Sequence, residues 1–328
     1  MPHDVVTFGE AMVRLSPPNF RRLEQSQSLD VQVGGAELNT AVGLARLGRN
    51  VAWVSRLTDN PLGRLIANRA REAGVDTRHV HYTKEDRVGL YFLEFGAAPR
   101  ASSVLYDRKD AAIAHIQPGQ VPWTTVLSGV RWFHVTGITP ALSTSAAETT
   151  REALKAARAA NVRTSIDLNY RAKLWTTTEA GRWMSEFMQL CDLLITTEED
   201  VEKVFGIRGD DYEAVARQLT ERFPLRVVAI TLRVNPLVWH NSWTAIAFRA
   251  GQVLRTRTYE VEIVDRLGAG DSFAAGLIHG MLEDDLQMGL DWGVAASAIK
   301  HSIPGDFAWI TREEVEALLK GGGLRISR

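Results

Sequence analysis

The glycine-rich segment at residues 265–271, Asp-Arg-Leu-Gly-Ala-Gly-Asp, has the residue types and the order expected of a phosphate-handling site. It follows a β-prone segment and precedes an apolar helical run, so it forms the turn between a strand and a helix. Backbone N–H groups in such a turn bind an anion at the N-terminus of the helix. Asp271 is placed to accept the proton of a hydroxyl beside that anion. The segment therefore predicts phosphoryl transfer to an alcohol, with an ordinary helix cap as the alternative. The residues assigned to the anion hole are Gly268, Ala269 and Gly270.

Two better-known phosphate-binding loops do not fit the chain. A dinucleotide fingerprint requires a third glycine where Phe273 stands. A P-loop requires Gly-Lys-Ser/Thr at its end, whereas the nearest match, residues 43–48, continues with Arg49 and Asn50. The chemistry therefore has to come from the strand–turn–helix at residues 265–271.

Composition excludes several classes of protein. The chain has 328 residues, 45% of them hydrophobic, which is enough to bury a large core. The net charge of −1 gives no electrostatic argument for binding nucleic acid or an anionic membrane surface. The single cysteine, Cys191, rules out an intrachain disulfide and a cysteine metal cluster. No signal peptide precedes the first strand and no apolar run is long enough to span a membrane, so we expect a cytoplasmic protein.

Strand-like and helix-like segments alternate along most of the chain. For example, the predicted helix at 61–73 begins with proline and is followed by Gly74, a common pair of helix boundaries. This alternation predicts a doubly wound α/β fold, in which helices cover a mostly parallel sheet and ligands bind at the carboxyl ends of its strands. The predicted strands are 4–8, 51–57, 131–136, 163–168, 192–196 and 226–232, and the predicted helices are 36–47, 61–73, 143–160, 178–190, 211–222, 270–283 and 287–301.

Two segments interrupt this alternation, residues 12–33 and 87–108. The first is polar and extended, and the second contains two runs with the period-2 pattern of strands and no helix between them. We predict that they form a small β-sheet beside the α/β body, which acts as a lid and excludes water from the reaction. An ordinary β-hairpin at the edge of the main sheet is the alternative.

Several polar residues lie where a substrate would contact such a body and lid. Gly34 and Gly35 precede a helix, so a ligand can approach the backbone closely, and Asn39 in the first turn can bond a sugar hydroxyl. Tyr106 and Arg108 share one face of a strand, which Tyr91 on the partner strand can also share. The alternatives are a tight turn with a solvated asparagine and a solvated arginine.

Arg171 lies just beyond the end of a predicted strand, in Asp-Leu-Asn-Tyr-Arg at 167–171. An arginine can form a fork with a carboxylate or phosphate, so two arginines at one pocket predict an acidic substrate. The alternative for Arg171 is a surface ion pair. Further along, Thr197 and Asp200 follow another strand, where they either cap a helix or hold a hydrated Mg²⁺ ion, and the two uses are compatible.

Taken together, these residues resemble the ribokinase/PfkB family of carbohydrate kinases. The signatures are Gly34-Gly35-Ala36-x-x-Asn39 near the N-terminus and Asp265-x-x-Gly268-Ala269-Gly270-Asp271 near the C-terminus. Within the family, the chain is most similar to 2-keto-3-deoxygluconate kinases, in stretches that include Tyr-Asp-Arg-Lys at 106–109 and Val-Thr-Gly-Ile-Thr-Pro-Ala-Leu at 135–142. The resemblance covers nearly the whole chain.

The resemblance implies a single ribokinase-like domain over residues 1–328 that uses ATP and Mg²⁺, with Asp271 as the catalytic base. It also implies a homodimer formed through the lid and leaves room for a monovalent cation. Water-mediated Mg²⁺ binding is assigned to Asp200. The residues assigned to the sugar are Gly34, Gly35, Asn39, Tyr91, Tyr106, Arg108, Arg171 and Asp306. The residues assigned to ATP are Asn169, Thr197, Thr231, Arg233, Gly268 and Gly270.

The chain departs from the family pattern at three places. The motif Asn-x-x-Glu, associated with Mg²⁺, is replaced by Thr197-x-x-Asp200, and the residue after Asp265 is Arg266 instead of threonine. The expected adenine-side loop at 231–236 contains no glycine, so we expect it to hold ATP differently, through Arg233.

The sequence thus predicts ATP-dependent phosphorylation of the primary hydroxyl of a sugar acid, 2-keto-3-deoxygluconate, to the 6-phosphate. A kinase for a neutral sugar such as fructose is one alternative. A non-catalytic sugar sensor that kept this fold is another, and an altered glycine-rich turn or a lost base would favour it. The chain retains Gly268, Gly270 and Asp271.

Overall fold

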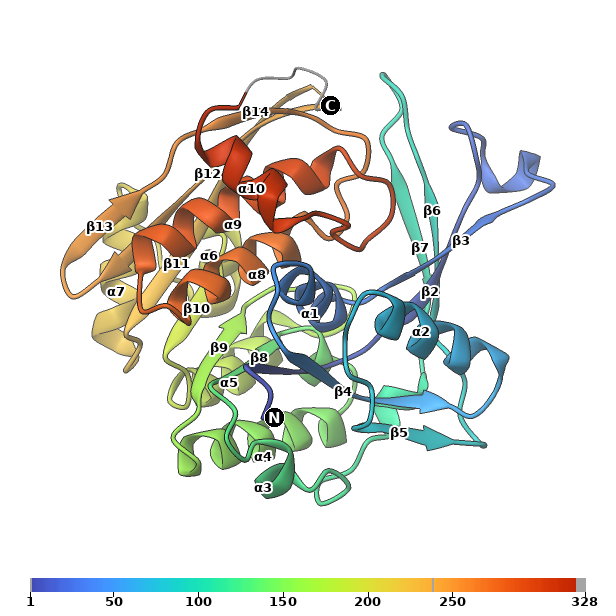
Figure 1. Ribbon diagram of the computed structural model, residues 1–328, viewed down its shortest axis with the longest axis horizontal. Helices are drawn as coiled ribbons and strands as arrows, with labels where there is room; N and C mark the ends of the chain where they lie inside the picture. Colours follow the sequence, from blue (N-terminus) through green and yellow to red (C-terminus); the bar gives the residue numbers. More distant parts are fainter. Residues whose placement is uncertain (1, 238, 323–328) are drawn as a thin grey trace.

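The computed structural model describes residues 2–237 and 239–322, with the backbone alone for residues 233–237. A ten-stranded sheet runs through it and is parallel from β5 to β11, which confirms the predicted α/β fold (Figure 1). The central strands are buried on both faces, which explains why they read as continuous apolar runs. In spatial order, the strands are β13 (Gln252–Arg255), β12 (His240–Arg249), β11 (Val227–Leu237), β10 (Leu193–Thr196), β9 (Arg163–Asp167), β8 (Trp132–Thr136), β1 (Val5–Phe8), β4 (Val51–Thr58) and β5 (Val80–Thr83), and β14 (Tyr259–Glu262) pairs with β12.

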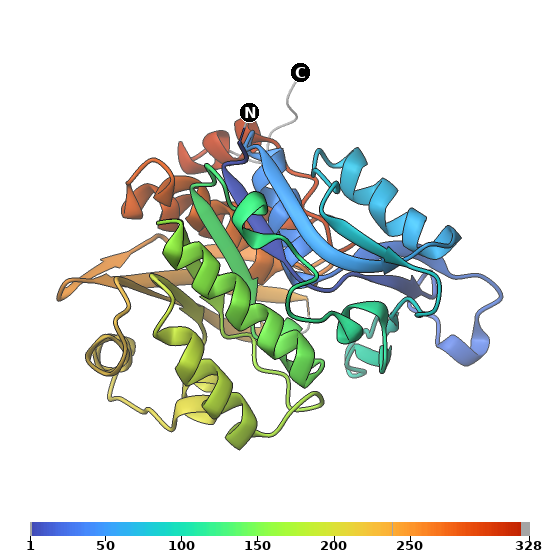
Figure 2. The same ribbon diagram turned by 90° about the horizontal axis from the view of Figure 1, so that it is seen from below.

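Helices cover both faces of this sheet and enclose two hydrophobic cores (Figure 2). None of the helices in the described part of the chain has the length and apolar character needed to cross a bilayer. One face carries α1 (Ala36–Arg46), α2 (Pro61–Glu72), α8 (Ala269–Met281) and α9 (Leu286–His301), with α10 (Arg312–Leu319) packed on α9. The other face carries α3 (Trp123–Val126), α4 (Thr144–Ala159), α5 (Thr177–Met188), α6 (Glu198–Phe205) and α7 (Tyr212–Arg222).

A separate four-stranded sheet stands beside the α/β body (Figure 1). Its central pair, β2 and β6, is parallel, so the segments around residues 12–33 and 87–108 combine in one sheet. The alternative of a hairpin at the edge of the main sheet is therefore wrong. In spatial order, its strands are β3 (Asp30–Gly34), β2 (Met12–Ser16), β6 (Leu90–Glu94) and β7 (Ser103–Asp107).

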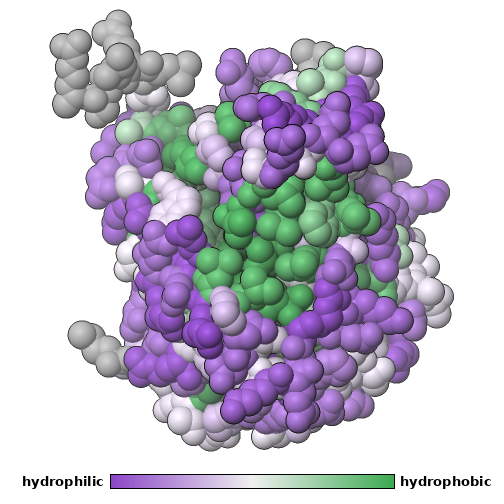
Figure 3. Space-filling view, turned by 90° about the vertical axis from the view of Figure 1, so that its right-hand side faces the viewer, coloured by the Kyte–Doolittle hydropathy of each residue, from purple (hydrophilic) through white to green (hydrophobic). Residues whose placement is uncertain are grey.

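The two faces of the small sheet differ in character. The register places Tyr91 opposite Tyr106 on the face that lines a cavity, which we call the inner face. The opposite face is apolar and partly exposed, and Leu105 and Val31 on it are 61% and 49% exposed. Figure 3 shows an apolar patch on this side of the molecule. We call this the outer face, and its residues are Leu15, Val31, Leu90, Phe92 and Leu105.

The C-terminal part of the sheet differs from prediction. The expected loop at 231–236 is instead part of β11, which continues to Leu237 and pairs antiparallel with β12. The register of this pair shifts between Val234 and Leu237, and Pro236 stands in that irregularity, where a strand tolerates the missing N–H. The loop was expected from the family pattern, whereas the chain here forms a hairpin with an irregular register. Strands β12 and β13 and helix α10 were also not predicted.

Candidate active site

Two cavities meet at the carboxyl edge of the main sheet. One lies under the inner face of the small sheet, and we call it the lid-side cavity. The other is larger, begins at the carboxyl ends of β9 and β10 and runs past β11 to β12, and we call it the sheet-edge cavity. Both cavities are lined by Asp271 and Gly268, so the candidate base lies where a ligand in one cavity would meet a ligand in the other. The other residues that line both are Asn169, Arg171 and Leu267.

The two glycines of the turn at 265–271 serve different purposes. Gly268 is the N-cap of α8 with φ of 79°, and a Cβ there would lie 2.0 Å from the carbonyl oxygen of Asp306. Only glycine fits this position. In contrast, a Cβ on Gly270 would meet no atom within 4 Å. Gly270 lines the sheet-edge cavity, so its missing side chain leaves room for a ligand at the N-terminus of α8.

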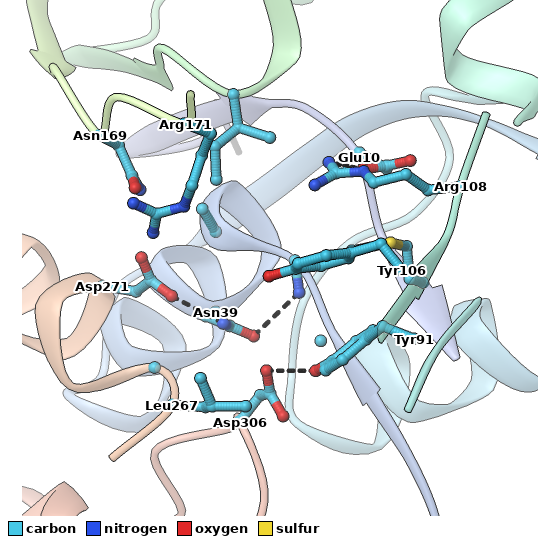
Figure 4. A pocket seen from close by; sticks show the side chains of 16 residues that line it. Glu10, Asn39, Tyr91, Tyr106, Arg108, Asn169, Arg171, Leu267, Asp271 and Asp306 are labelled. Carbon is cyan, nitrogen blue, oxygen red and sulfur yellow. Dashed lines mark hydrogen bonds and ion pairs between the residues drawn. The ribbon is translucent and has the colours of Figure 1, made fainter. Parts of the chain in front are cut away.

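Asp271 is held by a residue more than 200 positions away in the chain. Asn39 Nδ2 donates a hydrogen bond of 2.7 Å to Asp271 Oδ2, while Asn39 Oδ1 accepts one from the Gly35 N–H (Figure 4). Burial raises the pKa of Asp271 to about 6, and the Asn39 hydrogen bond opposes this rise. A pKa near neutrality suits a general base. The contact shows that Asn39 positions Asp271, a role that the sequence did not reveal, and its bond to a sugar hydroxyl stays a prediction.

A buried ion-pair network connects the small sheet to the α/β body. Arg14 of β2 is 1% exposed, and its Nη1 lies 2.7 Å from Asp265 Oδ2 and 2.9 Å from Asp306 Oδ1. Tyr91 of β6 donates a hydrogen bond of 2.5 Å to Asp306 Oδ2. Burial raises the pKa of Asp306, while Arg14 and Tyr91 lower it. Asp306 is therefore tied to two strands of the small sheet. Arg14, a lone arginine in the apolar run Met-Val-Arg-Leu-Ser, was the signal that sequence reasoning missed.

A second buried cation supports the turn from behind. The Lys300 ammonium is fully buried and donates hydrogen bonds to the carbonyl oxygens of Asp265, at 3.2 Å, and Ile303, at 3.0 Å. Burial lowers the pKa of Lys300, whereas the carboxylates of Asp265 and Asp306 raise it. The start of the glycine-rich turn is thus fixed through its carboxylate by Arg14 and through its carbonyl by Lys300.

Arg108 is not the solvated arginine that the sequence left as an alternative. It is 9% exposed, its guanidinium lies 5.4 Å from the centre of the Tyr106 ring, and it forms an ion pair with Glu10. Burial raises the pKa of Glu10, which Arg108 opposes. Tyr106 in turn stacks on Tyr91 with 5.9 Å between the ring centres. The cation at this end of the lid-side cavity therefore already has a protein counter-charge, and sequence reasoning missed Glu10.

Arg171 differs from Arg108 in this respect. It enters from the loop after β9, on the side of the cavity opposite Tyr106, and points toward Asp271 (Figure 4). Its Nη1 donates to the Tyr170 carbonyl at 3.2 Å, and within residues 2–237 and 239–322 no carboxylate forms a salt bridge with it. The alternative prediction, a surface ion pair at Arg171, is therefore wrong for the part of the chain that the structure describes. Arg171 is exposed and lowers the pKa of the nearby Asp200 and Asp271 carboxyls, so the junction of the two cavities holds a guanidinium that has carboxylates near it but no direct ion pair.

The residues assigned to ATP and the metal line the sheet-edge cavity, except that the side chain of Arg233 lies outside the described residues. Thr197 caps α6 by accepting a hydrogen bond from the Asp200 N–H, so the predicted cap is confirmed.

Asp200 is the residue assigned to Mg²⁺. Burial raises the pKa of Asp200, and Arg171 lowers it. The described residues contain no group of three or more acidic, His or Cys side chains fit for a metal. Mg²⁺ bound to phosphates needs only one or two carboxylates, so Asp200 fits a water-mediated role. The assigned residues that line the sheet-edge cavity are Asn169, Thr197, Asp200, Thr231, Gly268 and Gly270.

Comparison with known proteins agrees with this geometry. Residues 2–306 match the sequence pattern described as pfkB family carbohydrate kinase. The chain is 36% identical over 329 residues to the 2-dehydro-3-deoxygalactonokinase of Haloferax volcanii, with 100% of both chains covered. It is 29% identical to the 5-dehydro-2-deoxygluconokinase of Shouchella clausii, with 97% of this chain and 95% of that one covered.

Solved structures of other kinases have the same fold as this chain. A solved structure of the 2-dehydro-3-deoxygluconokinase from Thermotoga maritima is 44% identical and superposes with a TM-score of 0.94, covering 97% of this chain and 99% of that one. The ribokinase-like fold and the kinase assignment are thus both confirmed. The chain belongs to the pfkB family of carbohydrate kinases and is a sugar kinase close to those of 2-keto-3-deoxy sugar acids.

Proposed function

We propose that the protein transfers the γ-phosphoryl group of ATP to the primary hydroxyl of 2-keto-3-deoxygluconate and forms the 6-phosphate. The observation that carries this proposal is the position of Asp271 where the two cavities meet, next to the Arg171 guanidinium, which lines both cavities. The lid-side cavity, lined by polar and aromatic side chains, suits a sugar, and the sheet-edge cavity, which includes the N-terminus of α8, suits a nucleotide. A guanidinium that lines the cavity without a direct ion pair can bind a substrate carboxylate.

The proposed reaction uses few protein groups. Asp271 accepts the proton of the primary hydroxyl as that oxygen attacks the γ-phosphorus from the lid-side cavity. The bond between the γ-phosphorus and the β,γ-bridging oxygen breaks, and ADP leaves on the side of the sheet-edge cavity. Backbone N–H groups at Gly268–Gly270 then donate to the phosphoryl oxygens at the N-terminus of α8. Mg²⁺, held through water by Asp200, would neutralise charge on the phosphates. Asn39 keeps the Asp271 carboxylate facing the substrate throughout.

The substrate is held by groups from both the body and the lid. Arg171 and Arg108 approach from opposite sides of the lid-side cavity, and Tyr91 and Tyr106 form its aromatic wall. The 3-deoxy carbon of the proposed substrate has no hydroxyl to satisfy, which suits an aromatic surface. Segments 12–33 and 87–108 act as the lid and exclude water, so that the hydroxyl competes for the phosphoryl group.

The test is ATP turnover with Mg²⁺ on equal concentrations of 2-keto-3-deoxygluconate, its galactonate epimer, fructose and ribose. Preference for the gluconate-derived acid supports the proposal. Preference for its epimer would instead make the galactonate-derived acid, which differs at one hydroxyl, the substrate. The Glu10–Arg108 pair favours one other candidate, a neutral-sugar kinase, because the pair leaves the lid end of the cavity without net charge. Preference for fructose or ribose would establish that candidate, and no turnover on a wider sugar panel would favour the sensor.

The pH dependence of turnover gives a prediction. Because burial raises the pKa of Asp271 to about 6 and only the ionised carboxylate accepts a proton, kcat should rise with pH and level off above about 7. Replacing Asn39 by Ala removes the hydrogen bond that lowers this pKa, so the midpoint should move to higher pH. The measurement is kcat from pH 5 to 9 for both proteins, with Ser302→Ala as a surface control. If the midpoint does not shift in Asn39→Ala, the pH profile of kcat does not report the ionisation of Asp271.

We also propose a homodimer formed through the outer faces of two small sheets. A partly exposed apolar sheet face is unusual in a monomer, and a second copy offers the same face in return. We expect Leu105→Glu, which places a charge on this face, to convert a particle of twice the 36.4 kDa chain mass into one of a single chain. Light scattering on the purified protein measures this. Tyr212→Glu on α7, far from the small sheet, is the matched control and should stay dimeric. A wild-type monomer would rule the dimer out.

A further inference from the structure

Asn241 on β12 is a buried polar residue without a partner. It is 1% exposed, and neither its amide oxygen nor its amide nitrogen hydrogen-bonds to any described group. Almost all buried polar side-chain atoms in proteins have a hydrogen-bond partner. Asn241 lines the sheet-edge cavity, so a ligand in that cavity can supply both missing partners.

Trp243 has the same property two residues further along the strand. Residues two apart on a strand share a face, and Trp243 is 5% exposed, lines the same cavity and has no partner for its Nε1 among the described residues. Its ring is fixed by His301, with 5.3 Å between the ring centres. Two buried donor groups and one buried acceptor without a partner among the described residues therefore lie at the end of the cavity at β12.

The position of this wall along the cavity indicates which part of a nucleotide reaches it. The cavity crosses the sheet from Asn169 after β9, past Thr197 after β10 and Thr231 on β11, to Asn241 on β12. Three strand spacings of about 4.8 Å place β12 roughly 14 Å from β9. The phosphoryl group that is transferred lies at the β9 end, beside Asp271. The part of the nucleotide farthest from its terminal phosphate is the base, which therefore lies at the β12 end.

We propose that Asn241 recognises the base of the nucleotide and selects a 6-aminopurine. The inference rests on the proposed use of a nucleoside triphosphate. A carboxamide pairs with adenine by donating to a ring nitrogen and accepting from the exocyclic amino group, the pairing by which Asn reads adenine in nucleic acids. The same edge of a 6-oxopurine offers two acceptors and leaves the buried amide oxygen unpaired. The Nε1 of Trp243 remains available for the ribose or the base.

The experiment compares ATP with inosine triphosphate, which differs at the 6-position, by calorimetry on the full-length protein without sugar. Wild type should bind ATP about tenfold or more tightly than inosine triphosphate, as expected where a site's hydrogen-bonding group is left unpaired. Asn241→Leu should weaken ATP binding by a similar factor and bring the two affinities together. Ser242→Ala is the matched control, because this neighbouring side chain bonds Glu260 on the other face of β12 and should leave both affinities unchanged.

Each outcome decides the inference. Equal affinities of wild type for the two nucleotides would overturn it, even if Asn241→Leu fails to fold. Unchanged ATP binding in a folded Asn241→Leu or Asn241→Ala would also overturn it. If the wild-type protein still phosphorylates its sugar, the proposed function is unaffected by that result. Absence of ATP binding by wild type would instead remove the proposed function, and the inference with it.

Discussion

Replacing Asp271 by Asn is expected to lower kcat by about a thousandfold, within the roughly 10²–10⁴-fold range of general-base catalysis. The change removes the proton acceptor but keeps the shape of the side chain, and its amide oxygen can still accept the Asn39 hydrogen bond. Because the glycine-rich turn is untouched, ATP affinity should stay within about threefold, since the anion hole uses backbone groups. The measurements are kcat on the preferred sugar and the dissociation constant of ATP by calorimetry.

The matched control for this variant is Asp210→Asn, which makes the same chemical change at an exposed position away from both cavities. It should retain wild-type kcat. Full activity in Asp271→Asn would remove Asp271 as the base. A parallel loss of ATP binding would instead indicate that the carboxylate supports the turn, so the two readouts separate catalysis from structure.

Replacing Arg171 by Ala is expected to lower kcat/KM on the sugar acid by about a hundredfold, because a hydrogen bond to a charged group is worth about 1.5–3 kcal/mol. The loss on a neutral sugar should be under about threefold, since only the acid has a carboxylate for the guanidinium to bind. Steady-state kinetics on 2-keto-3-deoxygluconate and fructose measure the difference. Arg171→Lys should recover part of the loss, because it keeps the charge without the fork.

Lys173→Ala is the matched control, since it removes an exposed cation from the same loop. An equal loss on both kinds of sugar in Arg171→Ala would contradict the carboxylate argument and indicate a role toward the phosphates. Arg108→Ala tests the same idea less cleanly. It leaves the buried Glu10 carboxylate without its counter-charge, so folding is expected to suffer together with binding, and Arg108→Ala with Glu10→Gln is the better comparison.

The sequence predicted those parts of the site that lie within one local segment. The anion-binding turn was readable because Gly268, Gly270 and Asp271 stand between a strand and a helix, and the main sheet was readable from its buried apolar strands. The hairpin of β11 and β12 was not predicted, because the family pattern indicated a loop at 231–236 and the pairing of the two strands is visible only in the fold.

Contacts between distant segments could not be predicted in the same way. The Asn39–Asp271 hydrogen bond joins α1 to α8 across 232 positions, and the ion pair between Arg14 and Asp306 spans 292. Each depends on how helices and strands pack, which residue spacing does not encode. Asn241 was missed for a related reason, since its lack of a partner is visible only once the surrounding chain is in place.

The Lys300 ammonium, fixed between the carbonyl oxygens of Asp265 and Ile303, has a consequence for the solution conditions to which the enzyme responds. Paired carbonyl oxygens attract a small monovalent ion as well as an ammonium group, but an ion exchanges with the medium and a tethered side chain does not. The cation behind the glycine-rich turn is therefore part of α9 itself and is not drawn from the medium.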